Sequence, residues 1–140
     1  MSNQLFDAYF TAPAMREIFS DRGRLQGMLD FEAALARAEA SAGLVPHSAV
    51  AAIEAACQAE RYDVGALANA IATAGNSAIP LVKALGKVIA TGVPEAERYV
   101  HLGATSQDAM DTGLVLQLRD ALDLIEADLG KLADTLSQQA

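Results

Sequence analysis

The side chains best suited to chemistry gather in one short stretch, between residues 99 and 112. Five polar residues lie close together in it, namely His101, Thr105, Ser106, Gln107 and Asp108, and Asp111 and Thr112 follow. Imidazole, hydroxyl and amide groups can all donate hydrogen bonds, and several donors close together suit the binding of an anion. This stretch is therefore the first candidate for a binding site.

The spacing of Thr105 and Asp108 matches a capping box, in which a hydroxyl and an acidic side chain satisfy free N–H groups where a helix begins. Ser106 is an alternative cap, and Gly103 allows a sharp bend or a close approach of the backbone to a ligand. A helix N-terminus suits a carboxylate or phosphate. Two explanations stay open: an anion site, or a plain helix cap with one histidine nearby, since most capping boxes bind nothing.

The composition favours one all-helical domain. The chain has 140 residues, is 52% hydrophobic, contains no tryptophan and carries a net charge of −8. That charge argues against a nucleic-acid surface. The first residues lack the features of a signal peptide, and no apolar run is long enough to span a membrane, so we expect a cytoplasmic protein. The single cysteine, Cys57, is predicted to be a small core residue.

Apolar periodicity and cap residues predict six helices, two of which begin after the capping residues Ser20 and Asp63. A short entry helix precedes the first of these caps, within an entry segment that also carries Phe6. The expected helices cover residues 13–19, 21–43, 48–60, 63–72, 78–92 and 106–140. We place the N-terminal helical domain at residues 1–105 and the start of a long-helix domain at 106–140.

Two further candidates are charged or polar residues inside these helices and turns. Glu32 interrupts an apolar helix face that also carries Glu39, and we predict a partly exposed carboxylate paired locally, because buried charges are rare. His47 is predicted to be a surface or capping residue. The turn at Asn76 and Ser77, with Ser77 as cap, is either a simple turn or a small polar loop that holds a carboxylate.

Leucines and one isoleucine step by three and four residues along the last predicted helix, which is typical of a seam that packs against other helices. They are Leu114, Leu118, Leu122, Ile125, Leu129, Leu132 and Leu136. Such a seam needs partners, and the sequence predicts no second long helix to supply them. No stop signal follows Leu136, so we expect the sequence to be the N-terminal part of a longer protein.

Residues 101–112 have the form His-x-Gly-x-Thr-Ser-x-Asp-x-x-Asp-Thr, which closely resembles the first signature region of the fumarase/aspartase superfamily. Residues 13–46 are similar to its N-terminal domain. The form is that of the branch with adenylosuccinate lyases and muconate cycloisomerases. Residues 75–80, Gly-Asn-Ser-x-Ile-Pro, look like the cycloisomerases, because the Thr-x-His-Asp-Val motif of the lyases is missing. The family's phosphate-binding Arg-Tyr is also missing, since residues 7–10 read Asp-Ala-Tyr-Phe.

The resemblance implies a homotetramer with a central bundle of long helices and active sites built from three subunits. It implies that the other two signature regions, including the catalytic serine, lie beyond Ala140, so that this chain alone is inactive. The implied reaction is cycloisomerisation of a small tricarboxylate. No metal-ligand spacing, phosphate loop or cofactor motif appears in the sequence, so we predict no metal and no cofactor. The implied carboxylate-binding residues are His101, Thr105, Ser106 and Gln107, followed in rank by Asn76 and Ser77, while Asp108 and Asp111 brace the helix.

Two alternatives remain from the sequence. The first is a lyase of the same superfamily that eliminates fumarate from adenylosuccinate or a related adduct. The second is of another class: a non-catalytic helical interaction module, whose polar stretch is only a helix cap.

Overall fold

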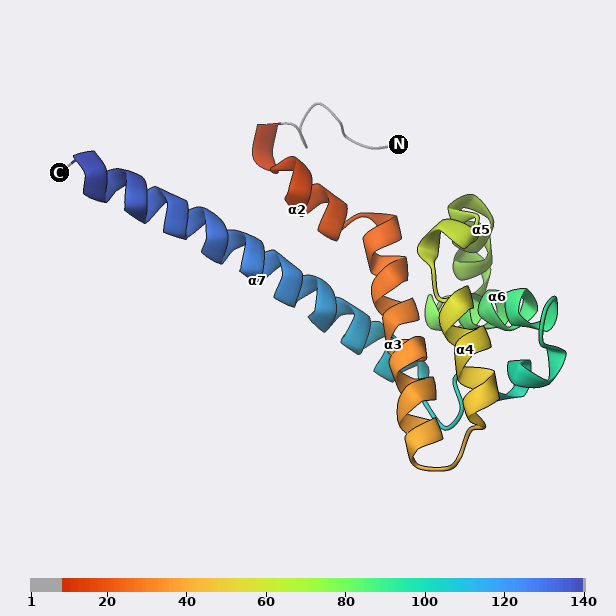
Figure 1. Cartoon of the computed structure of the whole chain (residues 1–140). Helices are drawn as coiled ribbons and strands as arrows, with labels where there is room; N and C mark the ends of the chain where they lie inside the picture. Colours follow the sequence, from red (N-terminus) through yellow and green to blue (C-terminus); the bar gives the residue numbers. More distant parts are fainter. Residues whose placement is uncertain (1–8, 140) are drawn as a thin grey trace.

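The computed structural model describes residues 9–139, and the regular structure in this range is helical (Figure 1). This confirms the prediction of an all-α fold. Phe6 and the Asp7-Ala8 pair of the sequence analysis lie outside the described residues. The α-helices are α2 (Pro13–Ile18), α3 (Asp21–Ser41), α4 (His47–Ala56), α5 (Val64–Ala74), α6 (Ala78–Ala90) and α7 (Ser106–Gln139), with 3₁₀ helices η1 (Ala59–Arg61) and η2 (Pro94–Tyr99).

Two of the predicted caps have the expected geometry. The Ser20 hydroxyl accepts a hydrogen bond of 3.0 Å from the Gly23 N–H at the start of α3. The Asp63 carboxylate accepts one of 3.0 Å from the Ala66 N–H at the start of α5. Helix α5 ends at Gly75, whose φ of 65° is a conformation that costs glycine little.

The third predicted helix is shorter than expected, because α4 ends at Ala56 and not at Glu60. The side chain of Gln26, from α3, interrupts it. The Gln26 amide donates to the Cys57 carbonyl at 3.1 Å and accepts from the Ala59 N–H at 2.8 Å. These bonds satisfy backbone groups that would otherwise need a continuing helix, so the chain can bend into η1.

The core lies where α3, α4 and α6 meet. Among its fully buried side chains are Leu29, Ile53, Leu81 and Leu85, from these three helices. Cys57 belongs to the same cluster, as predicted, and burial raises the pKa of its thiol to about 12. Helix α3 is therefore buried on one side by the core.

The other side of α3 crosses α7, and the crossing is close because two glycines face each other (Figure 1). A Cβ placed on Gly27 would lie 2.8 Å from the Gly113 carbonyl oxygen, and one placed on Gly113 would lie 2.9 Å from the Met28 nitrogen. The helix predicted at residues 21–43 is present as α3, with 21 residues, but its contact with α7 was not predicted. The sequence pattern missed it as a partner because small residues, not leucines, make this contact.

Beyond the crossing with α3 and its contact with the end of α2, α7 extends away from the other helices, as Figure 1 shows. The predicted seam is exposed along its length, from Leu114 at 36% to Leu122 at 64% and Leu136 at 57%. Within residues 9–139, no helix combines the length and the apolar character needed to cross a bilayer.

Candidate functional site

The capping box predicted at the start of α7 is present. Asp108 accepts hydrogen bonds from the Thr105 N–H and the Thr105 hydroxyl, both at 2.8 Å. In return, the Asp108 N–H donates to the Thr105 carbonyl at 3.1 Å and faces the Thr105 hydroxyl oxygen at 3.4 Å. The backbone bond from Thr105, followed by its hydroxyl bond, holds the pKa of Asp108 below its usual value. Asp108 is therefore an ionised brace.

The two residues before Asp108 are the first two of helix α7. Ser106 and Gln107 occupy the first two helical positions, whose N–H groups have no carbonyl partner in the preceding turn. The Gln107 side chain is fixed by a 2.7 Å bond from its amide to Asp111. Ser106, which is partly exposed, keeps its hydroxyl outside this network. Ser106 and the two N–H groups are thus the donors that the helix start offers to an anion.

His101 is fixed by a residue from a distant part of the chain. It is the only non-glycine residue with a positive φ, 56°, in the described part of the chain, and Gly103 follows with a φ of 70°. A positive φ is unfavourable for a residue with a Cβ, so something must hold it in place. The His101 Nδ1 lies 2.6 Å from a Glu32 carboxylate oxygen, and the Glu32 side chain is only 1% exposed.

The prediction that Glu32 is partly exposed and locally paired is therefore wrong. Its partner is 69 residues away along the chain. A periodicity argument sees Glu32 and His101 separately, and only the tertiary fold brings them together. A sequence signal did exist, because a carboxylate inside an apolar helix face requires a buried partner. Burial raises the pKa of Glu32, although its hydrogen bond and charge interaction with His101 oppose that shift.

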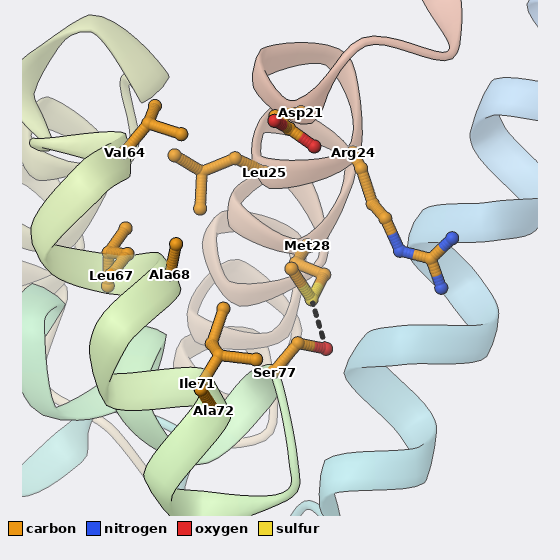
Figure 2. Close-up of a pocket in the computed structure, with 10 residues that line it drawn as sticks. All are labelled: Asp21, Arg24, Leu25, Met28, Val64, Leu67, Ala68, Ile71, Ala72 and Ser77. Carbon is orange, nitrogen blue, oxygen red and sulfur yellow. Dashed lines mark hydrogen bonds between the residues drawn. The ribbon is translucent and has the colours of Figure 1, made fainter. Parts of the chain in front are cut away.

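The second candidate loop is built differently from the prediction. Ser77 precedes α6 but its hydroxyl makes no capping bond. Instead, the Asn76 side chain accepts a hydrogen bond of 3.0 Å from the Ile79 N–H. The shorter Ser77 side chain points toward α3, where its hydroxyl lies 3.8 Å from the Met28 sulfur (Figure 2). Asn76, not Ser77, is therefore the cap of α6.

Helix α3 is the common support of the two loops. Met28 contacts Ser77, and Glu32, one helical turn further on the same side, binds His101. No hydrogen bond between described residues joins Asn76 or Ser77 directly to the stretch from His101 to Gln107. The structure thus places both loops along α3, but it does not connect their polar groups.

A pocket of about 340 Å³ lies beside Ser77, between α3 and α5. Figure 2 shows its apolar side chains facing one another, among them Leu25, Leu67 and Ile71, while Arg24 extends away from them toward α7. Arg24 was not a candidate in the sequence analysis. Arg24 is an exposed cation on α3, one helical turn before Met28, the residue that Ser77 faces. The pocket itself suits an apolar group better than a carboxylate.

Taken together, these groups can bind an anion at the start of α7. The donors are the N–H groups of Ser106 and Gln107, the Ser106 hydroxyl and the His101 imidazole, and the helix dipole adds to them. Within residues 9–139, no cluster of three or more His, Cys, Asp or Glu side chains is arranged to hold a metal ion.

Comparison with known proteins agrees with the all-helical fold. The model of the Lyase family matches residues 8–140. The chain therefore belongs to this lyase family. It is 97% identical over 140 residues, 100% of this chain and 33% of the relative, to the 3-carboxy-cis,cis-muconate cycloisomerase of Pseudomonas putida.

A solved structure with the same architecture is that of the 3-carboxy-cis,cis-muconate lactonizing enzyme from Pseudomonas putida. It superposes with a TM-score of 0.95 at 99% identity over 98% of this chain and 31% of that one. The adenylosuccinate lyase of Pyrococcus horikoshii is more distant, at 34% identity over 96% of this chain and 29% of its own length. The chain thus spans about a third of the length of the relatives it matches.

Proposed function

We propose that this chain forms the carboxylate-binding corner of a cycloisomerase that converts 3-carboxy-cis,cis-muconate to 4-carboxymuconolactone in protocatechuate degradation, within the beta-ketoadipate pathway. The observation that carries the proposal is the 97% identity to a cycloisomerase of that name over the whole chain. The donors gathered at the start of α7 support it, because the substrate carries three carboxylates.

The reaction is an intramolecular addition. One carboxylate oxygen attacks a carbon of a double bond in the same molecule, a new C–O bond closes the lactone ring, and the electron pair moves onto the activating carboxylate. Protonation of the neighbouring carbon then gives the product. Holding both ends of one substrate in place removes much of the entropic cost of ring closure. Donors aimed at the developing charge lower the barrier further.

In this proposal Ser106, His101 and the backbone N–H groups of Ser106 and Gln107 hold a substrate carboxylate. Thr105 acts through the cap, since its hydroxyl proton is directed to Asp108 at 2.8 Å. Asn76 and Ser77 are second candidates on the neighbouring loop. Asp108 and Asp111 face the donors and not the substrate, because a carboxylate next to a tricarboxylate would be repelled.

The proposal also includes assembly of the full-length protein into a homotetramer. The exposed seam of α7 packs against the long helices of other copies in a homotetramer, and groups from other subunits and from further regions of a longer chain complete each site. The proton-transferring residues belong to those regions, so the 140-residue chain alone has no turnover. We place the enzyme in the cytoplasm.

Adenylosuccinate lyase activity is the second candidate, since such a lyase is 34% identical to this chain. The loop at Asn76 and Ser77 argues against it, because the sequence contains no histidine there. The Asn76 side chain caps α6 and the Ser77 hydroxyl faces Met28.

Absorbance assays of a full-length protein that carries this chain, with 3-carboxy-cis,cis-muconate and with adenylosuccinate, separate the two candidates. We expect turnover of the muconate alone. Replacing Ser106 with alanine should lower kcat/KM about tenfold or more, the effect of losing one hydrogen bond to a charged group.

Ser137→Ala is the matched control, because Ser137 lies on the exposed outer part of α7. If a Thr105→Ala/Ser106→Ala double variant keeps both fold and activity, the side chains at the start of α7 do not bind substrate. The assignment of these residues to the substrate site is then wrong, and the polar stretch is only a helix cap.

A further inference from the structure

We propose that Glu32 is a positioning residue: it shares one proton with Nδ1 of His101 and thereby keeps Nε2 as a hydrogen-bond donor aimed at a substrate carboxylate. The inference rests on the proposed function for the identity of that ligand. The proton arrangement itself follows from the geometry of the chain.

The contact between the two side chains is short and isolated from water. Nδ1 of His101 and Oε1 of Glu32 are 2.6 Å apart, the usual length of a charge-assisted bond. The Glu32 side chain is 1% exposed and that of His101 is 16% exposed. The second Glu32 oxygen, Oε2, is buried and lacks a hydrogen-bond partner among the described residues. Among the described residues, His101 is therefore the one whose polar groups stabilise the charged form of this carboxyl group.

The position of the shared proton does not change what the ring presents outward. If the proton is on Nδ1, Glu32 is a carboxylate and His101 an imidazolium, whose Nε2 carries hydrogen. If it is on Glu32, the neutral imidazole accepts through Nδ1 and must carry its hydrogen on Nε2. Nε2 would be an acceptor only if the pair held one proton fewer, with the neutral ring donating from Nδ1 to the Glu32 carboxylate. That state would leave a buried negative charge at Glu32 with no compensating positive charge on the ring, which is costly.

The other titratable groups around the pair differ in their effect. Glu39, further along α3, is also buried, and its own charge would add to the cost of an unprotonated pair. Asp108, at the start of α7, is bonded to Thr105, which lowers the pKa of its carboxyl group. Cys57, after α4, keeps its proton because burial raises the pKa of the thiol to about 12. These surroundings favour the pair that holds its proton.

The same bond fixes the direction of the ring. His101 has a φ of 56°, and its ring lies edge-on to Phe31 with the centroids 6.4 Å apart. A side chain in this backbone region returns to an ordinary conformation unless it is held. Glu32 holds it from α3, which the core and the Gly27–Gly113 crossing make rigid. The bond thus selects both the protonation of Nε2 and its orientation.

Nitrogen NMR of the ¹⁵N-histidine-labelled chain tests the proton arrangement. The chain has two histidines, so His47, which is exposed at the start of α4, serves as the reference in the same sample. At pH 7 we expect His101 Nε2 to be protonated and the proton near Nδ1 to resonate far downfield. A deprotonated Nε2 in the wild-type chain at pH 7 overturns the inference.

Two variants test the role of Glu32 itself. Glu32→Met keeps the length of the side chain, and we expect the downfield proton signal of His101 to disappear. Glu39→Met removes a buried carboxyl from the same helix and should leave that signal in place. Loss of the signal in both variants would overturn the specific role of Glu32. The wild-type spectrum decides the inference even if Glu32→Met does not fold.

In a full-length protein that carries this chain, Glu32→Gln should raise KM for the muconate about tenfold, with a smaller change in kcat, because one hydrogen bond to a charged ligand is lost. An unchanged KM would overturn the role in binding. If the wild-type protein does not turn over the muconate, the proposed function fails while the NMR result still decides the proton arrangement. The two failures are therefore distinguishable.

Discussion

Helix α7 carries two stripes that differ in residue size and in environment. The inner stripe is buried against the rest of the chain, and its members step by four residues: Ala109, Gly113, Gln117 and Ala121. The outer stripe, the leucine seam that begins at Leu114, is exposed. Within the inner stripe, Gln117 donates a 2.6 Å hydrogen bond to the Ile18 carbonyl and so attaches the end of α2.

The difference shows that hydrophobic size alone does not identify the contact made inside this chain. Two helices come closest where their side chains are smallest, so alanine and glycine mark the internal crossing. Large apolar side chains remain outside, and an exposed apolar surface of this kind is typical of a site that contacts another molecule. The inner stripe therefore serves packing within the chain, and we propose that the outer stripe serves assembly.

The largest effect is expected at the crossing. Gly113→Val should destabilise the chain by about 3 kcal/mol, because its Cβ would overlap the Met28 backbone nitrogen, 2.9 Å away. Urea unfolding followed by circular dichroism measures the change.

Gly130 provides the control, since nothing lies within 4 Å of a Cβ placed there. Gly130→Ala should stabilise the chain by roughly 0.5–1 kcal/mol through helix propensity. Equal effects at the two glycines would show that the crossing is not tightly packed.

A smaller effect is expected at the helix start. Thr105→Ala should cost about 1 kcal/mol, the usual value for a lost N-cap. Because the bonds from Thr105 lower the pKa of Asp108 from 3.8, the stability they add is present above that pH and is lost as pH falls through the lowered pKa.

The difference between wild type and Thr105→Ala should therefore shrink in acid, as measured by thermal unfolding at several pH values. Thr135→Ala, on the outer part of α7, removes a threonine hydroxyl that bonds only to its own helix. It should change stability by no more than about 0.5 kcal/mol. A Thr105 effect that grows in acid would contradict the assigned cap.

The burial of Glu39 on α3 can be tested through the pH dependence of stability. Burial raises the pKa of Glu39 from its usual 4.5, so the folded chain keeps this proton to a higher pH than the unfolded chain does. Wild-type stability should fall as pH rises from about 4.5 through the raised pKa. Glu39→Gln has no ionisable carboxyl group at this position. It should therefore become progressively more stable than wild type over that range, as measured by urea unfolding at each pH. A constant difference would mean that Glu39 ionises freely.

The smallest effect on the chain is expected at the seam. Leu132 is 53% exposed, so Leu132→Lys should change the unfolding free energy by no more than about 0.5 kcal/mol. Self-association in sedimentation velocity of a full-length protein should decrease, because a charge would enter the proposed helix contact. A loss of more than 1 kcal/mol in the isolated chain would show that the seam packs internally.

Much of the fold could be predicted from local patterns. The all-α class, the caps at Ser20 and Asp63, and the capping box at Thr105 and Asp108 are confirmed. The end of α4 was not predictable, because Gln26 reaches it from another helix. The assignments to carboxylate binding all stay predictions: His101, Thr105, Ser106, Gln107, Asn76 and Ser77.

The sequence by itself determined where helices begin, since caps and apolar periodicity act over a few residues. It also determined the family, through the spacing of residues 101–112. Only the tertiary structure decided the partner of Glu32 and the nature of the crossing at Gly27 and Gly113. Both join residues far apart along the chain, so their energies depend on packing that no local pattern contains.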